Sequence, residues 1–163
     1  MKIRLEGAEV ALARHLAAHR YKSNRAGKIG DQQVGKQDEA FIDLNGVGGE
    51  LAVAKALNVW PDLSISPRKG GADLVSNGCR IDVKTTHYPD GKLLAVTSKD
   101  PGDVDVFILV TGRIPEYTIV GWCWAHELIN PDRIGDLGHG PTYYLEQSKL
   151  RGFGDVLKSR RVF

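Results

Sequence analysis

The sequence predicts a single α/β domain of the α+β type, in which a central mixed β-sheet is flanked by helices. Three observations indicate this class: apolar residues at helical spacing before residue 58, alternating or continuous apolar runs after residue 61, and turn dipeptides between those runs. The length of 163 residues fits one domain. Within it we expect a basic N-terminal helix and loop over 1–37, a core over 38–125 and a C-terminal extension over 126–163.

Two helices are predicted in the N-terminal third. Apolar spacing predicts an amphipathic helix over 5–21, and a polar, glycine-containing loop follows over 23–37. A second helix is expected within 39–57. Its strongest segment begins at Glu50, and Asn58 stands where a C-cap is wanted. We expect the glycines inside this second helix to bend or interrupt it, namely Gly46, Gly48 and Gly49.

Strands are expected after Pro61. Asn77-Gly78 is a strong two-residue hairpin turn, and it joins short strands over 73–76 and 79–86. The continuous apolar run over 104–110 predicts a central strand that is buried on both faces. The remaining expectations are strands over 63–66, 93–97, 117–124 and 143–145, with short helical pieces near 125–129 and 148–151.

The composition excludes several classes of protein. Hydrophobic residues make up 42% and charged residues 26%, as in ordinary soluble domains, so disorder, collagen and coiled coil are poor interpretations. No run approaches the ~18 apolar residues of a membrane helix, and the first residues do not form a signal peptide. Cys79 and Cys123 lack metal-ligand spacing and suit a reduced compartment. We therefore expect a soluble, cytoplasmic protein without membrane contact.

The net charge of +2 is unevenly distributed. Residues 1–36 carry eight basic and three acidic side chains, and 133–163 carry six basic and three acidic ones, so the centre is acidic. Basic ends around an acidic centre fit a polyanion-binding protein whose centre holds cations. A solvated basic helix face is the alternative explanation. The candidate contacts to a DNA backbone are Arg14, Arg20, Lys22, Arg25, Lys28, Arg68 and Lys69.

An acidic cluster with a lysine is predicted at the Asn77-Gly78 hairpin. Asp82 and Lys84 project from the same face of their strand, because side chains alternate with period two. The turn brings Asp73 close to Asp82 across the strand pair. Two carboxylates and the Val83 carbonyl can hold a hard divalent cation such as Mg²⁺, for which Mn²⁺ substitutes, and the cation acidifies a bound water.

The pattern of an acidic residue followed two positions later by a lysine occurs often by chance. It occurs a second time at Asp90-Gly91-Lys92, inside a turn and without a preceding carboxylate. An exposed strand face with a salt bridge is therefore a real alternative for Asp82 and Lys84.

Glu50 makes the pattern more specific. A helix-borne Glu, a hairpin Asp and then Asp–apolar–Lys occur in the order found in the PD-(D/E)XK nuclease superfamily, which the chain resembles from about Asp38 to Val110. The resemblance implies a restriction-endonuclease-like catalytic core. It implies that Asp73 bridges the metal, Asp82 is the second acidic ligand, Lys84 is the motif lysine, and Glu50 holds a metal directly or through water.

The resemblance has departures and leaves functions open. Ala72 stands where proline is usual, and the second acid is the shorter Asp82. The whole chain is also similar to small phage-encoded or mobile-element members, which would place it in a host cytoplasm. We expect a Mg²⁺-dependent endonuclease acting on DNA, with double-stranded DNA as the preferred partner and a homodimer as a family expectation. The alternatives are an inactive nuclease-like module that binds DNA or a host protein, and a phosphodiesterase acting on RNA or a small molecule.

Overall fold

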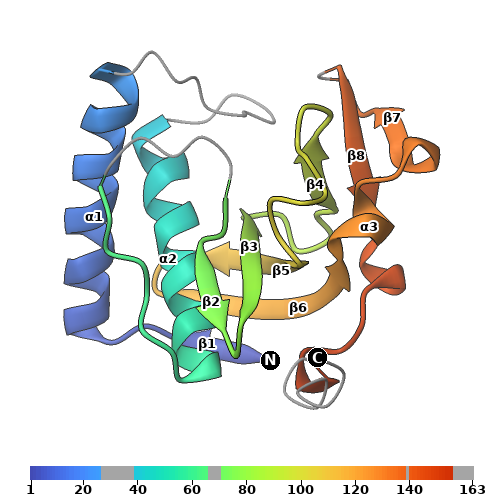
Figure 1. Ribbon diagram of the computed structural model, residues 1–163. Coiled ribbons are helices and arrows are strands. Elements are labelled where there is room, and N and C mark those ends of the chain that lie inside the picture. Colours follow the sequence, from blue (N-terminus) through green and yellow to red (C-terminus); the bar gives the residue numbers. More distant parts are fainter. Residues whose placement is uncertain (27–38, 66–70, 139, 156–163) are drawn as a thin grey trace.

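The computed structural model describes residues 1–26, 39–65, 71–138 and 140–155, and its mixed helices and strands confirm the expected α+β class (Figure 1). In chain order the elements are β1 (Lys2–Arg4), α1 (Gly7–Ala26), α2 (Glu39–Leu57), β2 (Leu74–Ser76), β3 (Cys79–Thr86), β4 (Leu93–Val96), β5 (Val106–Arg113), β6 (Glu116–Trp124), α3 (Ala125–Leu128), β7 (Ile134–Asp136) and β8 (Pro141–Leu145). Three 3₁₀ turns complete the set: Pro131–Arg133, Gln147–Lys149 and Phe153–Asp155.

The strands form two sheets. The larger one has the order β1-β6-β5-β3-β2, and β3 and β5 are its only parallel neighbours among the described strands. The smaller sheet has the order β4-β8-β7 and is antiparallel throughout. The chain leaves the large sheet after β3, forms β4, and returns to lay β5 beside β3. This excursion makes the parallel pair possible, since parallel strands need a crossover connection.

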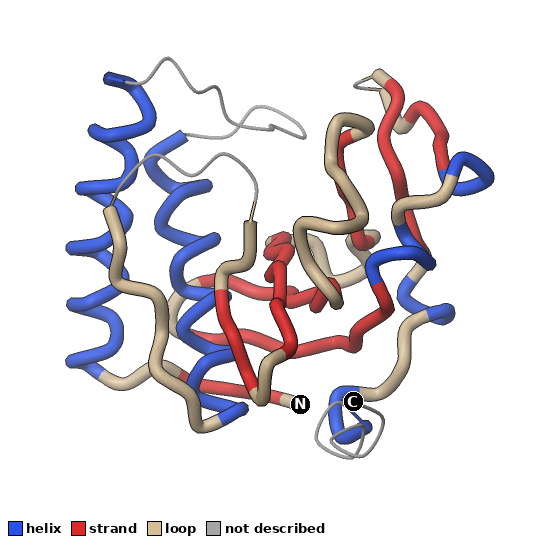
Figure 2. The backbone as a smooth tube through the Cα atoms, viewed as in Figure 1, coloured by secondary structure: helices blue, strands red, loops and turns tan. Residues whose placement is uncertain are grey.

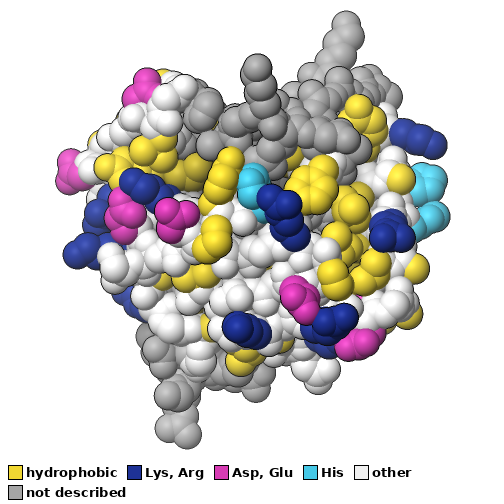
Figure 3. Space-filling view, turned by 180° about the vertical axis from the view of Figure 1, so that it is seen from behind, with side chains coloured by type: hydrophobic (Ala, Val, Ile, Leu, Met, Phe, Trp, Pro, Cys, Tyr) yellow, Lys and Arg dark blue, Asp and Glu magenta, His cyan; other side chains and the backbone are white. Residues whose placement is uncertain are grey.

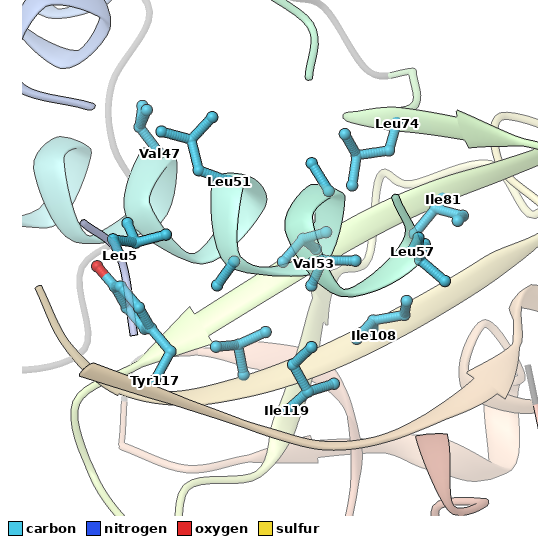
Figure 4. Close-up of a cluster of buried hydrophobic side chains, with 14 of the residues drawn as sticks. Leu5, Val47, Leu51, Val53, Leu57, Leu74, Ile81, Ile108, Tyr117 and Ile119 are labelled. Atoms are coloured by element: carbon cyan, nitrogen blue, oxygen red, sulfur yellow. The ribbon is translucent and has the colours of Figure 1, made fainter. Parts of the chain in front are cut away.

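The two sheet faces of β5 belong to different hydrophobic clusters. α2 packs against the large sheet and α1 packs against α2, as Figure 2 shows. Ile108 points into the larger cluster beneath these helices, together with Ile81 of β3 (Figure 4). Phe107 and Leu109 point the other way, into a smaller cluster with the β4–β8 sheet. Even-numbered β3 residues such as Asp82 therefore face away from the helices, because side chains alternate along a strand.

The glycines of α2 do not interrupt it, so that expectation was wrong. α2 is continuous from Glu39 to Leu57. A Cβ on Gly48 would lie 2.0 Å from the Tyr117 hydroxyl, and a Cβ on Gly49 would lie 2.0 Å from Thr85 Oγ1. These glycines let the helix approach the sheet closely, and the burial gained there outweighs their low helix propensity.

Two turn predictions are confirmed. Asn58 has a φ of 52° at the end of α2. The Val59 N–H donates to the Ala54 carbonyl at 3.0 Å and the Asn58 N–H to the Lys55 carbonyl at 3.2 Å, which is the Schellman pattern. Asn77 and Gly78 have φ of 51° and 80°. Positive φ at both positions is what a type I′ hairpin turn requires.

Other expectations were wrong or incomplete. Residues 63–65 form no strand, and the strand predicted there is lost because this segment runs beside the helices as an irregular connection. α1 extends to Ala26, into the predicted loop. Two strands were not predicted from the sequence: β1, which pairs with β6, and β7 of the small sheet. Within the described residues, no helix is both long enough and apolar enough to cross a membrane.

Candidate active site

The hairpin places Asp73 opposite Asp82. The register pairs Leu74 with Ile81, and the Asp73 N–H donates to the Ile81 carbonyl at 2.8 Å. The side chain of Asp73 is held as well, because its Oδ2 accepts the Val83 N–H at 2.7 Å. The Asp73 carboxyl group is therefore fixed at the edge of β3, next to Asp82.

The carboxylates of Asp73 and Asp82 lie just past the point where β2 stops pairing with β3. β2 pairs with β3 only as far as Ile81, so beyond it no described strand adjoins β3 on this side. The N–H and the carbonyl of one strand residue point to the same edge. Since the Val83 N–H points toward Asp73, the Val83 carbonyl does so too. This places the oxygen named in the sequence analysis as a further ligand on the side of Asp73.

Asp82 is held between two lysines. Its exposed fraction is only 3%. Oδ1 lies 2.8 Å from Lys84 Nζ, and Oδ2 lies 3.1 Å from Lys99 Nζ. The Lys84 side chain is 37% exposed, whereas the Lys99 side chain is 8% exposed. One lysine therefore borders solvent and the other lies inside the protein.

Glu50 has a buried basic partner. Arg20 Nη1 donates to Glu50 Oε2 at 2.8 Å, and these side chains are 10% and 16% exposed. The same guanidinium donates to the Ser64 carbonyl at 3.0 Å and to the Asp62 carbonyl at 2.8 Å. This corrects the prediction that Arg20 contacts a DNA backbone, because all its described bonds are internal. It also gives Glu50 Oε2 an arginine partner.

The carboxylates influence one another electrostatically. Burial, together with the negative charges of Glu50 and Asp82, raises the pKa of Asp73 to about 7, against the lowering effect of the Val83 N–H and Lys84. Burial lowers the pKa of Lys84, but Asp82, Asp73 and Glu50 outweigh it and the net shift is upward. Four residues from α2, the start of β2 and β3 therefore form one electrostatic cluster.

The cluster offers few oxygen ligands, but Mg²⁺ needs only a few from the protein. No group of three His, Cys, Asp or Glu side chains within the described ranges is arranged to hold a metal. However, Mg²⁺ is usually bound through one or two carboxylates, with water and substrate phosphate completing the shell. Asp82 Oδ1 is buried, and its contact among the described residues is the ion pair with Lys84, whose side chain is partly exposed. Asp73, Asp82 and the Val83 carbonyl therefore fit one ion.

The other predicted DNA contacts are only partly described. Arg14 and Lys22 are exposed on α1. Lys28, Arg68 and Lys69, together with the side chain of Arg25, lie outside the described residues. On the face turned away from the viewer in Figure 1, basic and acidic side chains are interspersed (Figure 3). The described residues of that face form no continuous basic surface.

Sequence reasoning missed Lys99 and misassigned Arg20. Lys99 stands in a polar stretch after β4, and nothing local distinguishes it from a solvated loop lysine. The burial of Arg20 could have been predicted, because Arg20 continues the buried stripe of α1 formed by Ala13, Leu16 and Ala17. A basic residue on a buried stripe requires an acidic or carbonyl partner.

Comparisons with protein families, with curated proteins and with solved structures gave no significant match, so the function has to be inferred from the site itself.

Proposed function

We propose that the protein is a metal-dependent endonuclease that hydrolyses DNA phosphodiester bonds at the cluster of Asp73, Asp82 and Lys84. One observation carries the proposal: Asp73 lies opposite the buried Asp82 where the pairing of β2 with β3 ends, with Lys84 at 2.8 Å from Asp82. This is the arrangement that the PD-(D/E)XK resemblance implies. The proposal is supported further by the partial exposure of Lys84, which lets its ammonium leave Asp82 Oδ1 for a phosphate.

Each side chain has a distinct task in this proposal. Asp73 and Asp82 supply carboxylate oxygens, and the Val83 carbonyl lies on the same side as Asp73. These oxygens would hold a divalent cation, which would supply an acidified water for attack on phosphorus. Lys84 is the more exposed of the two lysines and keeps its proton, so its ammonium can turn to the phosphate and offset the charge that develops in the transition state.

Glu50 and Arg20 act as positioning residues. The bonds from Arg20 to Glu50, Asp62 and Ser64 tie α1, α2 and the 59–65 segment together. This fixes Glu50 at a place from which its charge acts on Asp73. Pre-organised charge around a cation site costs no rearrangement during the reaction.

DNA is proposed as the substrate because of the charge distribution. A polyanion is bound through basic side chains, and the chain has basic ends on either side of an acidic middle that could hold a cation. Exposed Arg14 and Lys22 on α1 supply part of this charge. Contacts of this type read phosphates and carry no base preference.

The test is cleavage of supercoiled plasmid, linear duplex and branched DNA, with a structured RNA alongside, in Mg²⁺, Mn²⁺ or chelator. The expected result is metal-dependent cleavage that Asp82→Asn, Asp73→Asn and Lys84→Met each reduce at least about 100-fold. The chain contains its own matched control: Asp90→Asn and Lys92→Met alter the second acid–any–Lys pattern, in which Asp90 is exposed in a turn and Lys92 pairs with Glu146. Cleavage that persists in Asp82→Asn would refute the site.

A second function is favoured by the charge balance of the cluster. Glu50 pairs with Arg20, and Asp82 pairs with two lysines. Such compensation suits a nuclease-like module that binds DNA or a host protein without turnover. In that case the DNA panel shows binding in chelator and no cleavage, and Mn²⁺ titration shows no bound ion.

A further inference from the structure

Lys99 reaches the cluster from outside the predicted motif. It follows β4 in the connection that leads to β5, and its backbone N–H donates to the Val96 carbonyl at 3.1 Å. Its ammonium lies 3.1 Å from Asp82 Oδ2, and its side chain is 8% exposed. The connection therefore delivers a buried positive charge to one oxygen of the candidate metal ligand.

A buried lysine requires an explanation. Lysine stems usually lie along the surface with the ammonium in water, and removing both members of an ion pair from water is costly unless the charges are well matched. Lys92 shows the ordinary arrangement, because it pairs with Glu146 at 2.7 Å near the surface. Lys99 instead has its ammonium at a carboxylate that is 3% exposed.

The two lysines of Asp82 differ in their freedom to move. Lys84 on Oδ1 is 37% exposed, so it can exchange Asp82 for water or a phosphate at low cost. Lys99 on Oδ2 is enclosed, so leaving Asp82 would strand its charge in the interior. A cation that approaches Asp82 can therefore displace Lys84 but meets a fixed positive charge at Oδ2.

We propose that Lys99 permanently occupies Oδ2 of Asp82 and thereby restricts the site to a single divalent cation. This inference rests on the proposed function, since it concerns the same carboxylates. Two-metal sites need carboxylate oxygens for two ions about 3.5–4 Å apart. Here the Lys99 ammonium occupies Asp82 Oδ2, the oxygen that a second ion would need. Lys99 thus contributes one positive charge where a second ion would contribute two.

Titration of the purified protein with Mn²⁺ alone, followed by the spin-resonance signal of free Mn²⁺, tests this inference without reference to activity. The wild type should bind one ion per chain. Lys99→Gln should bind Mn²⁺ on the order of tenfold more tightly, because a like charge next to the ion is removed. Lys99→Arg, which keeps the charge, and Lys92→Gln, the matched surface lysine, should retain the wild-type affinity. Circular dichroism establishes that each variant is folded.

The outcomes separate the two proposals. Two ions bound to the wild type, or unchanged or weaker binding by folded Lys99→Gln, would overturn the role of Lys99 and leave the nuclease proposal standing. No binding to the wild type at any Mn²⁺ concentration would overturn both. If Lys99→Gln does not fold, the wild-type stoichiometry and Lys99→Met decide the matter.

Discussion

Arg20 of α1 and Glu50 of α2 form a 2.8 Å ion pair that is almost enclosed, with side chains 10% and 16% exposed. The pair joins the outer helix to the helix that packs on the sheet. Arg20, which the sequence suggested as a DNA contact, therefore serves as an internal structural link between the two helices.

Removal of this brace should destabilise the protein. Arg20→Met leaves the Glu50 carboxylate and two carbonyls without their donor, and the free energy of unfolding should fall by about 3 kcal/mol or more. Arg14→Met, on the exposed face of the same helix, should change it by less than about 0.5 kcal/mol. Urea unfolding measures both. Equal effects would contradict the internal role of Arg20, and the double variant Arg20→Met/Glu50→Leu should recover part of the loss.

The glycines of α2 should respond in opposite directions to alanine. Gly46→Ala should raise stability by about 0.5–1 kcal/mol, because nothing lies within 4 Å of the new Cβ and alanine favours helix. Gly48→Ala should lower it by about 1–3 kcal/mol, because the new Cβ collides with the Tyr117 hydroxyl. Thermal unfolding of the two variants compares them directly. A stabilising Gly48→Ala would show that α2 does not pack closely on β6.

Asp73 should make the metal-free protein less stable as pH rises. Its pKa is raised to about 7 in the folded protein, against about 3.9 in an unfolded chain. Between these values the folded state binds more protons, so unfolding becomes easier as pH increases and levels off above pH 7. In chelator, Asp73→Asn should match the wild type near pH 4 and exceed it by on the order of 3 kcal/mol at pH 8. If the unfolding free energies of wild type and Asp73→Asn changed with pH in the same way, ionisation of Asp73 would not destabilise the folded protein.

The two cysteines should differ in reactivity. Burial raises the pKa of Cys123 to about 12, and its side chain is fully enclosed. Cys79 is half-buried at the start of β3. Iodoacetamide at pH 8 should therefore modify one thiol of the native protein, and Cys79→Ser should abolish that reaction, because only the thiolate is nucleophilic. Both thiols should react in denaturant, and rapid labelling of native Cys123 would show that the smaller cluster is open.

The sequence predicted those features that depend on local chemistry. The bounds of α2 and β3, the Asn58 cap and the Asn77-Gly78 turn follow from propensity, capping and positive φ, which act over a few residues. The opposition of Asp73 and Asp82 follows from the turn, because a two-residue hairpin sets the register.

Features that depend on tertiary contact escaped prediction. The continuity of α2 through Gly48 and Gly49 depends on Tyr117 and Thr85, which lie far away in the sequence. Arg20 is buried because Glu50 and two carbonyls meet it there. No periodicity around Lys99 indicates its ion pair with Asp82.

The side chains of β5 alternate between two hydrophobic clusters, one under the helices and one under the small sheet. The acidic residues lie near the boundary between these two parts of the protein. Glu50 comes from α2, Asp73 directly precedes β2 and Asp82 lies on β3, whereas Lys99 follows β4 of the small sheet. Proteins open in such cooperative units at different free energies. If the small-sheet half opens first, Lys99 withdraws while Asp73 and Asp82 keep their backbone in place. Amide exchange of β4 and β8 would then report how often the acids lose their buried counter-charge.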